Sequence, residues 1–514
     1  MDDLFMTPQQ AWDALVNYRQ KYYRKYIAAY SGNRQELNAT GHRGTFWKRA
    51  GKCKIHVPLA ADIAATSSDL LFSEEPRFTC YDEETEDNES DQQKRLDFLV
   101  KKNGIHSKLN EAAEDAACAG DVYLKLNWWQ DKLEFPALTV VNGDSAWPEF
   151  LFGLLQCIHF FSVVRADYKT GKVIRAYERY ERGKISMGLF SGNEYNLGTE
   201  MPEADLRQLG FEKVIITPVD DMLAVHIPNI KPNREFRDSH MGRSDFDGQR
   251  DLMDELDETY SSWMRDIRLA KARTIVPAEY LRRKPEDMFK EGEYTYEFDE
   301  DVETLVALDI DTQNGKSGNP ITLSQFDIRA AEHAQTCADL ICRIVTSAGY
   351  APQTFGLNIE GMAQSGTALH IRENKSYKTS GKKQAYWTAA LEEIMTAMVH
   401  LDAVLYSGAG SDIDDEVKVH FSESMASDIS TMSAAVKMIH DAQAASIDTK
   451  VAMLHPDWTK KQISEEVHRI MDEQGMGMDN PDMGRGDYHT LHMNNPHRNN
   501  AGSENVQEEK GDEE

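Results

Sequence analysis

The sequence has no run of about 18 apolar residues, the length that a membrane-spanning helix needs. Its first residues, MDDLFMTPQQ, lack the basic and apolar segments of a secretory signal. The six cysteines are scattered, and the nearest pair, Cys337 and Cys342, matches neither a CxxC motif nor a disulfide framework. These absences predict a water-soluble protein with buried free thiols, no membrane contact and a reducing, cytoplasm-like compartment.

Positive charge is also scarce. The chain has 57 basic residues against 86 acidic ones, which gives a net charge of -29. A surplus of acid repels nucleic acid and argues against a general DNA-binding protein, because contact with phosphates needs a basic surface. Any contact with DNA is therefore expected to be local. The length of 514 residues predicts two to four packed regions instead of a single core.

Motifs for catalysis and metal binding are missing. No GxxxxGK[ST] occurs, and the Gly-rich segment 349–366 follows a predicted helix where a phosphate-binding loop would follow a strand. Residues 309–320 have acids at alternate positions, as a calcium-binding loop does, but lack the glycine and the closing glutamate of such a loop. Neither GxSxG nor HExxH is present, and three histidines near the C-terminus lack partners at ligand spacing: His489, His492 and His497. We predict no catalytic residue, no metal and no cofactor.

The N-terminal half is predicted to combine helices with a mostly antiparallel β region. Thr7 and Pro8 have the types expected at the start of a helix. Residues 120–228 contain short segments rich in aromatic and β-branched residues, separated by Gly, Asp and Asn, which is typical of strands. The acidic run 82–94 is predicted to be a solvated loop. Helices are expected over residues 1–30, 57–76 and about 95–118.

Two long helices, residues 248–274 and 324–348, are predicted to flank a small β-rich insert. The first is expected to end at Pro277, and the second to begin at a capping-box-like sequence from Ser324 and to end at Gly349. Apolar residues at steps of three and four form a stripe on each helix: Leu256, Tyr260, Trp263 and Ile267 on the first, and Ile341 and Val345 on the second.

The C-terminal part begins with an irregular Gly-punctuated segment and a helix of roughly forty residues, 366–407, that is expected to bend at Gly381. The sequence EVKVHFSES predicts one more strand. Two shorter helices are expected at about 427–445 and 459–474. The residues after them lack apolar periodicity and are predicted to be disordered.

A basic stripe opens the long helix. Between residues 370 and 383 the sequence has one acid and five basic residues: Arg372, Lys375, Lys378, Lys382 and Lys383. The first four lie along one helical face. Three interpretations stay open: a solvated face, pairing with acids of a neighbouring subunit, and contact with a polyanion such as DNA.

The order of these elements resembles that of the portal proteins of tailed bacteriophages, in the long-tailed siphophage branch. Four strings carry the resemblance: VPLAADIAATSSDLLFSEEP, GDVYLKLNWW, APQTFGL and SGTALHIRENKSYKTSGKKQAYWTAALEEIM. It implies an α+β portal fold with these parts: wing 1–247, stem helix 248–274, clip 275–323, stem helix 324–348, tunnel loop 349–366, long bent wing helix plus strand 367–424, crown 425–475 and a disordered acidic tail 476–514.

The resemblance also implies a function. Portal proteins form a non-enzymatic ring of twelve at one capsid vertex of the virion, assembled in the host cytoplasm. The terminase large subunit packages double-stranded DNA through the channel, which later releases it. Head-completion or connector proteins and the major capsid and scaffolding proteins are further implied partners. DNA would be met without sequence readout by residues of the tunnel loop: Asn358, Gln364, Ser365 and Thr367.

The apolar stripes of the two stem helices would then pack against neighbouring subunits.

Two alternatives from other classes stay open. One is a nucleic-acid-processing enzyme with a basic DNA-contacting helix, although no catalytic motif accompanies that helix. The other is a capsid structural protein without a channel.

Overall fold

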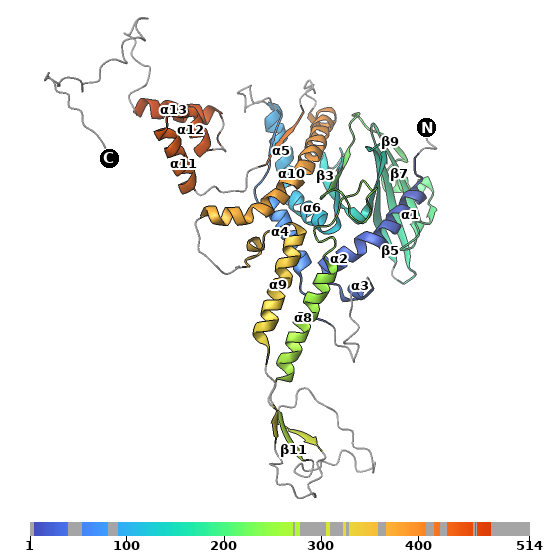
Figure 1. Cartoon of the computed structure of the whole chain (residues 1–514). Coiled ribbons are helices and arrows are strands. Elements are labelled where there is room, and N and C mark those ends of the chain that lie inside the picture. Colours follow the sequence, from blue (N-terminus) through green and yellow to red (C-terminus); the bar gives the residue numbers. More distant parts are fainter. Residues whose placement is uncertain are drawn as a thin grey trace, which may run out of the picture. The chain divides into compact units, whose positions relative to one another are not determined.

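The structure, a computed structural model, describes most of the chain and divides it into two compact units, Met1–Ala426 and Ser427–Glu514. The described residues are 5–39, 54–80, 91–167, 169–270, 273–277, 305–308, 322–324, 328–357, 366–407, 416–421, 429–455, 458 and 460–473. Helices and sheets are mixed throughout the first unit, which confirms the α+β class (Figure 1).

The N-terminal helices begin as predicted. Thr7 caps α1 through its hydroxyl, which accepts from the Gln10 backbone N–H, while the Gln10 side chain accepts from the Thr7 N–H. This capping box satisfies two N–H groups that have no partner within the helix. The helical segment that follows ends at Gly32, which has a left-handed φ of 62°. Its parts are α1 (Pro8–Tyr18), a π-helical turn (Arg19–Tyr23) and α2 (Arg24–Ser31), and a separate helix, α3 (Arg34–Ala39), follows Gly32.

The helix expected at about 95–118 is two helices, α5 (Asp91–Asn103) and α6 (Ile105–Ala119). The break falls at Gly104, whose φ of 59° lies in the left-handed region that other residues rarely adopt. The predicted helix within 57–76 is confirmed as α4 (Leu59–Phe72). Helix α6 packs against α4 and against strands β2 and β3, and its alanine-rich face is buried in that core.

The predicted antiparallel region forms two sheets. A three-stranded sheet has the order β10-β2-β3, and a larger sheet has the order β4-β5-β6-β7-β8, with β9 also paired to β7. All pairings in both sheets are antiparallel. The strands are β2 (Asp121–Asn127), β3 (Ala137–Asn142), β4 (Ala146–Leu151), β5 (Leu154–Asp167), β6 (Lys172–Glu181), β7 (Lys184–Gly192), β8 (Thr199–Glu200), β9 (Val214–Ile216) and β10 (Ala224–Pro228). A short helix, α7 (Glu203–Gln208), precedes β9.

Two long helices, α8 (Arg250–Leu269) and α9 (Ala330–Ala348), lie side by side (Figure 1). Their predicted ends need two corrections. Helix α8 stops before Pro277, which instead ends strand β11, and α9 starts after Ser324, which ends strand β13. The predicted cap at Gly349 is confirmed, with a φ of 108°. Between the helices, β11 (Arg273–Pro277) pairs parallel with β12 (Leu305–Leu308) and antiparallel with β13 (Thr322–Ser324).

Helix α10 (Gly366–Asp402) is the longest described helix, with 37 residues. It continues through Gly381 as helix and changes direction along its length (Figure 1). A π-helical turn (Ala403–Ser407) ends it. The strand expected in EVKVHFSES is confirmed as β14 (Lys418–His420), which pairs antiparallel with β1 (Arg77–Thr79).

The second unit contains α11 (Ile429–Asp441), α12 (Ile447–Leu454) and α13 (Lys460–Glu473). The two expected helices are confirmed. Helix α12, which was not predicted, is capped by Ser446, whose hydroxyl accepts from the Thr449 N–H. The predicted disordered tail and most of the acidic run 82–94 lie outside the described residues. None of the described helices is long and apolar enough to cross a membrane.

Candidate functional site

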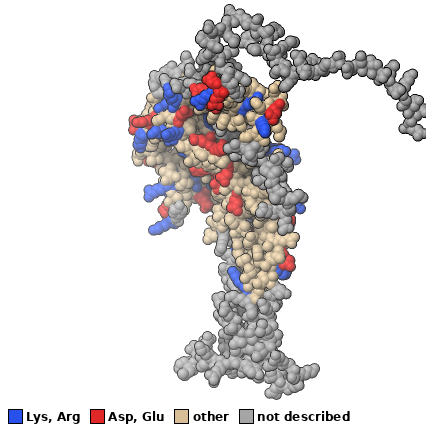
Figure 2. Space-filling model, turned by 90° about the vertical axis from the view of Figure 1, so that its left-hand side faces the viewer, with Lys and Arg blue, Asp and Glu red and all other residues tan. Residues whose placement is uncertain are grey.

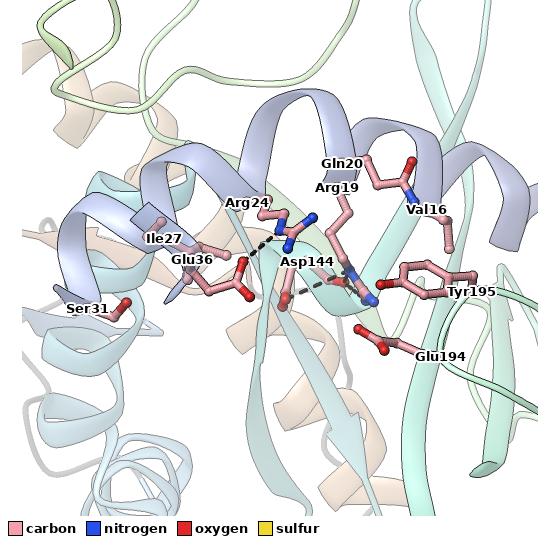
Figure 3. Close-up of a pocket in the computed structure, with 11 residues that line it drawn as sticks. Val16, Arg19, Gln20, Arg24, Ile27, Ser31, Glu36, Asp144, Glu194 and Tyr195 are labelled. Carbon is pink, nitrogen blue, oxygen red and sulfur yellow. Dashed lines mark hydrogen bonds and ion pairs between the residues drawn. The ribbon is translucent and has the colours of Figure 1, made fainter. Parts of the chain in front are cut away.

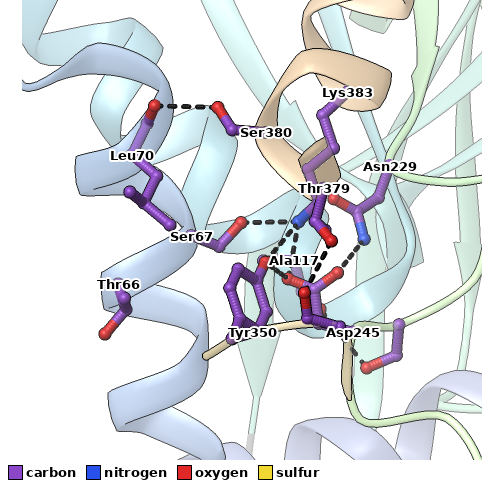
Figure 4. A network of polar contacts seen from close by, with 12 residues as sticks. Thr66, Ser67, Leu70, Ala117, Asn229, Asp245, Tyr350, Thr379, Ser380 and Lys383 are labelled. Carbon is purple, nitrogen blue, oxygen red and sulfur yellow. Dashed lines mark hydrogen bonds and ion pairs between the residues drawn. The ribbon is translucent and has the colours of Figure 1, made fainter. Parts of the chain in front are cut away.

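A buried polar network joins the segment after α9 to α10 (Figure 4). Its centre is the Lys383 ammonium, which donates to Asp245 Oδ2 at 2.6 Å, Ser67 Oγ at 2.6 Å and the Tyr350 hydroxyl at 3.0 Å. All three N–H donors of the lysine are therefore used. The Tyr350 hydroxyl donates in turn to Asp245 Oδ2 at 2.6 Å, and the Asn229 amide donates to Oδ1 at 2.8 Å. The network thus connects α4, the segment before α8, the end of α9 and α10.

Lys383 and Asp245 are almost fully removed from water, with 1% and 0% of their side chains exposed. Burial lowers the pKa of the Lys383 ammonium, and the adjacent Asp245 carboxylate acts against that change. Burying two charges is costly unless they are paired and their remaining hydrogen-bonding groups are satisfied, as they are here. The same burial raises the pKa of the Tyr350 hydroxyl, which therefore stays protonated and can donate. With its donors used and its charged groups buried, this cluster acts structurally, as an anchor.

Three further side chains of α10 form hydrogen bonds near the anchor, two of them to the segment after α9 and one to α4. Ser376 Oγ accepts from the Ala351 N–H at 2.8 Å, Thr379 Oγ1 donates to the Gly349 carbonyl at 2.6 Å, and Ser380 Oγ donates to the Leu70 carbonyl at 2.9 Å. A Cβ at Gly349 would lie 3.0 Å from Thr379 Oγ1, so the position favours glycine both by its φ and by its crowding. The chain that leads from α9 toward residues 358–365 is therefore fixed at its first residues.

The basic residues predicted at the start of α10 lie in different environments, some exposed and one buried. Lys383 is corrected: it lies in the anchor, so it is not available to DNA or to a neighbouring subunit. Lys375 is exposed and donates to the Thr346 carbonyl in the last turn of α9. Lys378 and Lys382 are exposed, and neither makes an ion pair within the described part of the chain. The Arg372 side chain lies outside the described residues.

The predicted DNA-facing residues are not placed by the structure. Asn358, Gln364 and Ser365 lie outside the described residues, and Thr367 belongs to the first turn of α10 with its side chain outside them. What the structure does place is the segment on their N-terminal side. A single 3-10 turn, Pro352–Phe355, follows the anchored residues and ends at Gly356, whose φ is 71°.

The predicted ring-packing residues of the long helices differ in how far they are buried. Leu256 and Val345 are corrected, because both are buried in the chain's own core and cannot reach a neighbouring subunit. Ile267 points outward, with 41% of its surface exposed. The remaining three are partly buried and pack against that same core: Tyr260, Trp263 and Ile341.

Polar contacts join the ends of α8 and α9 that adjoin the β-rich insert. The Asp266 carboxylate accepts from Arg329 Nη2 at 2.8 Å and from His333 Nε2 at 3.0 Å. These hydrogen bonds, that of His333 first, lower the pKa of Asp266. The His333 ring stacks on Trp263, with centroids 6.1 Å apart and planes at 10°. In Figure 2 the surface formed by α9 lies beneath the charged upper part of the molecule and is mostly uncharged. This agrees with the exposed Ala and Thr residues along that helix.

A pocket of about 240 Å³ lies between the N-terminal helices and the turn before β4 (Figure 3). Its two guanidinium groups are already engaged. The Arg24 Nε donates to Glu36 at 2.6 Å, and Arg19 Nε donates to the Asp144 carbonyl at 3.1 Å. Glu194 adds further negative charge to the lining. With its cations paired inside the chain, the pocket offers no obvious site for an anion.

Comparison with known proteins gives one family match. Residues 17–479 match the family model described as phage portal protein, SPP1 Gp6-like. No curated protein matches the chain. Among solved structures the chain is similar to one in the virion of a native gene transfer agent particle, at 11% identity and a TM-score of 0.44, covering 84% of this chain and 98% of that one. It is also similar to a chain in the neck of that native particle, computed with C12 symmetry, at 11% identity and a TM-score of 0.39, covering 77% and 89%.

Proposed function

The chain belongs to the phage portal protein family, SPP1 Gp6-like, and from this membership we propose that it forms the ring-shaped channel at one vertex of a viral capsid. DNA enters the capsid through this channel during packaging and leaves through it during ejection. The family is structural, so the proposed role needs no catalytic residue. The observation that carries the proposal is the extent of the match, from residue 17 to residue 479, which includes the wing-like α/β region, both long helices and α10.

Each part has a proposed role in the ring. Helices α8 and α9 are the stem that surrounds the channel, and the β-rich insert between them is the clip to which the terminase large subunit and later the connector proteins bind. Residues 349–366 are the tunnel loop. Its fixed N-terminal end, held by Lys383 and Asp245, supports the proposal, because a loop that borders moving DNA needs a rigid base. The capsid and scaffolding proteins would contact the outer surface, and the ring would contain twelve copies in the virion.

The acidic composition suits a conduit. Each phosphate that a Lys or Arg neutralises adds affinity through counterion release, and a ring of identical subunits multiplies that affinity. A channel that passes long DNA must not hold it tightly, and a net charge of -29 per chain limits such contacts. Weak contacts without sequence readout would come from short polar side chains of the tunnel loop: Asn358, Gln364, Ser365 and Thr367.

For the exposed basic residues of α10 we propose a contact with acids of the neighbouring subunit. Lys378 and Lys382 have no ion-pair partner among the described residues, whereas each chain carries 86 acids. Reversing both charges, Lys378→Glu with Lys382→Glu, should then reduce ring assembly. If rings form normally while DNA packaging fails, the two lysines contact DNA instead.

Negative-stain imaging of the purified full chain tests the function directly. The expected result is a closed, symmetric ring with a central hole wide enough for duplex DNA. A solid assembly without a hole would favour a capsid protein that forms no channel. Monomers with nuclease or ATPase activity would overturn the proposal in favour of an enzyme.

A further inference from the structure

Three potential metal ligands meet on one face of the large sheet, far in sequence from the proposed channel parts. Glu149 lies on β4 directly opposite Cys157 on β5, because the two strands pair antiparallel with these residues in register. His159 follows two positions later on β5, so its side chain points to the same face as that of Cys157. Cys157 and His159 are fully buried, and Glu149 is partly buried.

The ligand atoms are spaced as a tetrahedral metal site requires. Cys157 Sγ lies 3.5 Å from both His159 Nε2 and Glu149 Oε2, and the last two atoms are 3.2 Å apart. Bonds of about 2.3 Å to sulfur and about 2.0 to 2.1 Å to nitrogen and oxygen, at tetrahedral angles, place ligand atoms about 3.3 to 3.6 Å apart. The two separations from sulfur fall within this range, and the nitrogen–oxygen separation of 3.2 Å is slightly shorter, so a small adjustment of the Glu149 side chain is enough. We propose that Glu149, Cys157 and His159 bind a zinc ion or another divalent ion of similar preference.

The groups around the cluster suit such a site. His159 Nδ1 lies 2.9 Å from the Tyr177 hydroxyl, a contact that fixes the ring and leaves Nε2 directed at the other two ligands. The Met6 N–H donates to both oxygens of Glu149 at 3.2 Å. Metal-binding histidines and carboxylates are commonly held by such outer contacts. The Arg179 guanidinium, which pairs with Glu181, lies beside Cys157, where its positive charge favours a thiolate.

Binding requires the ligand forms of both side chains. A neutral imidazole supplies the lone pair that a metal needs, and cysteine binds a metal as the thiolate. On binding, the S–H bond breaks, a sulfur–metal bond forms and the proton goes to solvent. Three protein ligands leave one position for water, which can approach past the partly exposed Glu149.

The role of such an ion would be to fasten strands β4 and β5 to each other and to hold the N-terminal segment at Met6 against them. In the metal-free protein, hydrogen bonds hold the three side chains together. Metal binding therefore has to be measured on the full chain, after treatment with a chelator and its removal.

Cobalt is a suitable probe, because a cobalt–thiolate bond absorbs in the near ultraviolet and tetrahedral cobalt absorbs strongly in the visible. We expect one cobalt ion per chain, displaced by zinc. Cys157→Ser should abolish the thiolate band, whereas Cys342→Ser, which changes a half-buried cysteine of α9, should leave it unchanged. Tyr177→Phe should weaken cobalt binding about 10-fold to 100-fold while keeping the band, because it removes only a positioning contact.

Two results would overturn the proposal. The first is a parent protein that binds no cobalt or zinc at micromolar concentration. The second is a thiolate band that persists in Cys157→Ser, which would place the metal on another cysteine. Should Cys157→Ser fail to fold, Glu149→Gln provides the matching test, since it keeps the size of the side chain and removes the negative ligand. Unchanged cobalt affinity in that variant would likewise contradict the proposal.

Discussion

Lys382 and Lys383 are adjacent on α10, yet they differ in every physical respect. Lys382 is exposed to solvent, whereas Lys383 is fully buried against Asp245, Ser67 and Tyr350. One residue turns a helix by about 100°, which is enough to move a side chain from the surface to the core. A count of basic residues treats the two as equivalent, and only their partners tell them apart.

This difference gives a matched pair of variants. Lys383→Met should lower the free energy of unfolding by about 3 to 5 kcal/mol, because it leaves the Asp245 carboxylate buried without its counter-charge. Lys382→Met, at the exposed neighbour, should change it by less than about 0.5 kcal/mol. Urea unfolding of both variants provides the measurement. Equal effects of the two substitutions would show that the anchor contributes little to stability.

Asp115 on α6 provides a prediction about pH. Desolvation and, next, the charge of Asp144 raise the pKa of Asp115 to about 7, and its Oδ2 is buried without a hydrogen-bond partner in the described structure. A folded-state pKa above the unfolded value means that the folded protein holds the proton more tightly. The stability contributed by this group is therefore complete below about pH 4 and is lost as the pH rises through about 7.

Asp115→Asn should remove that dependence, since an amide does not titrate. We expect the variant to be more stable than the parent at pH 8 by roughly 2 to 4 kcal/mol and similar to it at pH 4. Thermal unfolding across this range is the measurement. Asp69→Asn, the same substitution at an exposed position of α4, serves as the control. An identical pH profile for parent and Asp115→Asn would contradict the prediction.

At the level of elements, the sequence predicted those whose signals are local. The Thr7 cap, the Gly349 end of α9 and the β14 strand each depend on a few neighbouring residues, and all three are confirmed. The failures come from competition between elements. Ser324 has a sequence suited to a helix start but pairs with Arg273 in the insert, because the pairing of β13 with β11 satisfies the same backbone groups.

The candidate site was less accessible to sequence reasoning, although a signal was present. Ser376, Ser380, Lys383 and Trp387 recur at steps of three and four and form the buried face of α10. A lysine on that face needs a buried acid, but nothing in the sequence identifies Asp245 as the partner. In the same way, Cys157 and His159 are visible as a pair on one strand, whereas Glu149 joins them only through the register of β4 and β5.

Gly381 tests whether α10 needs a flexible residue. It lies within the helix, and a Cβ placed there would meet nothing within 4 Å. Gly381→Ala should therefore raise the free energy of unfolding by about 0.5 to 1 kcal/mol, because alanine loses less conformational freedom in a helix. Ala385→Gly, at an exposed site one turn later, should lower it by a similar amount. A destabilised Gly381→Ala would instead show that the helix bends at this residue and that the bend excludes a side chain.

For the whole molecule, the proposed ring requires surface that the isolated chain leaves exposed. The two long helices bury Leu256 and Val345 internally, and Trp263 packs against His333 of the same chain. A substitution at any of these would weaken the subunit as well as the ring. Ile267, exposed to 41%, is an apolar residue of α8 that separates the two effects.

Ile267→Asp should therefore prevent or weaken ring formation while leaving the thermal midpoint of the subunit unchanged. A cyclic ring repeats one heterologous contact around its axis, so a carboxylate that is buried there without a partner destabilises every interface. A cost of about 2 kcal/mol at each contact is expected when a polar group is buried unpaired. Mass photometry measures the fraction of rings. Comparing Ile267→Asp with Ile267→Val, which keeps an apolar side chain, separates the effect of the new charge from the effect of a changed side-chain shape. If Ile267→Asp formed as many rings as the parent, Ile267 of α8 would not lie in the proposed interface. The exposed face of α9 would then have to provide that interface.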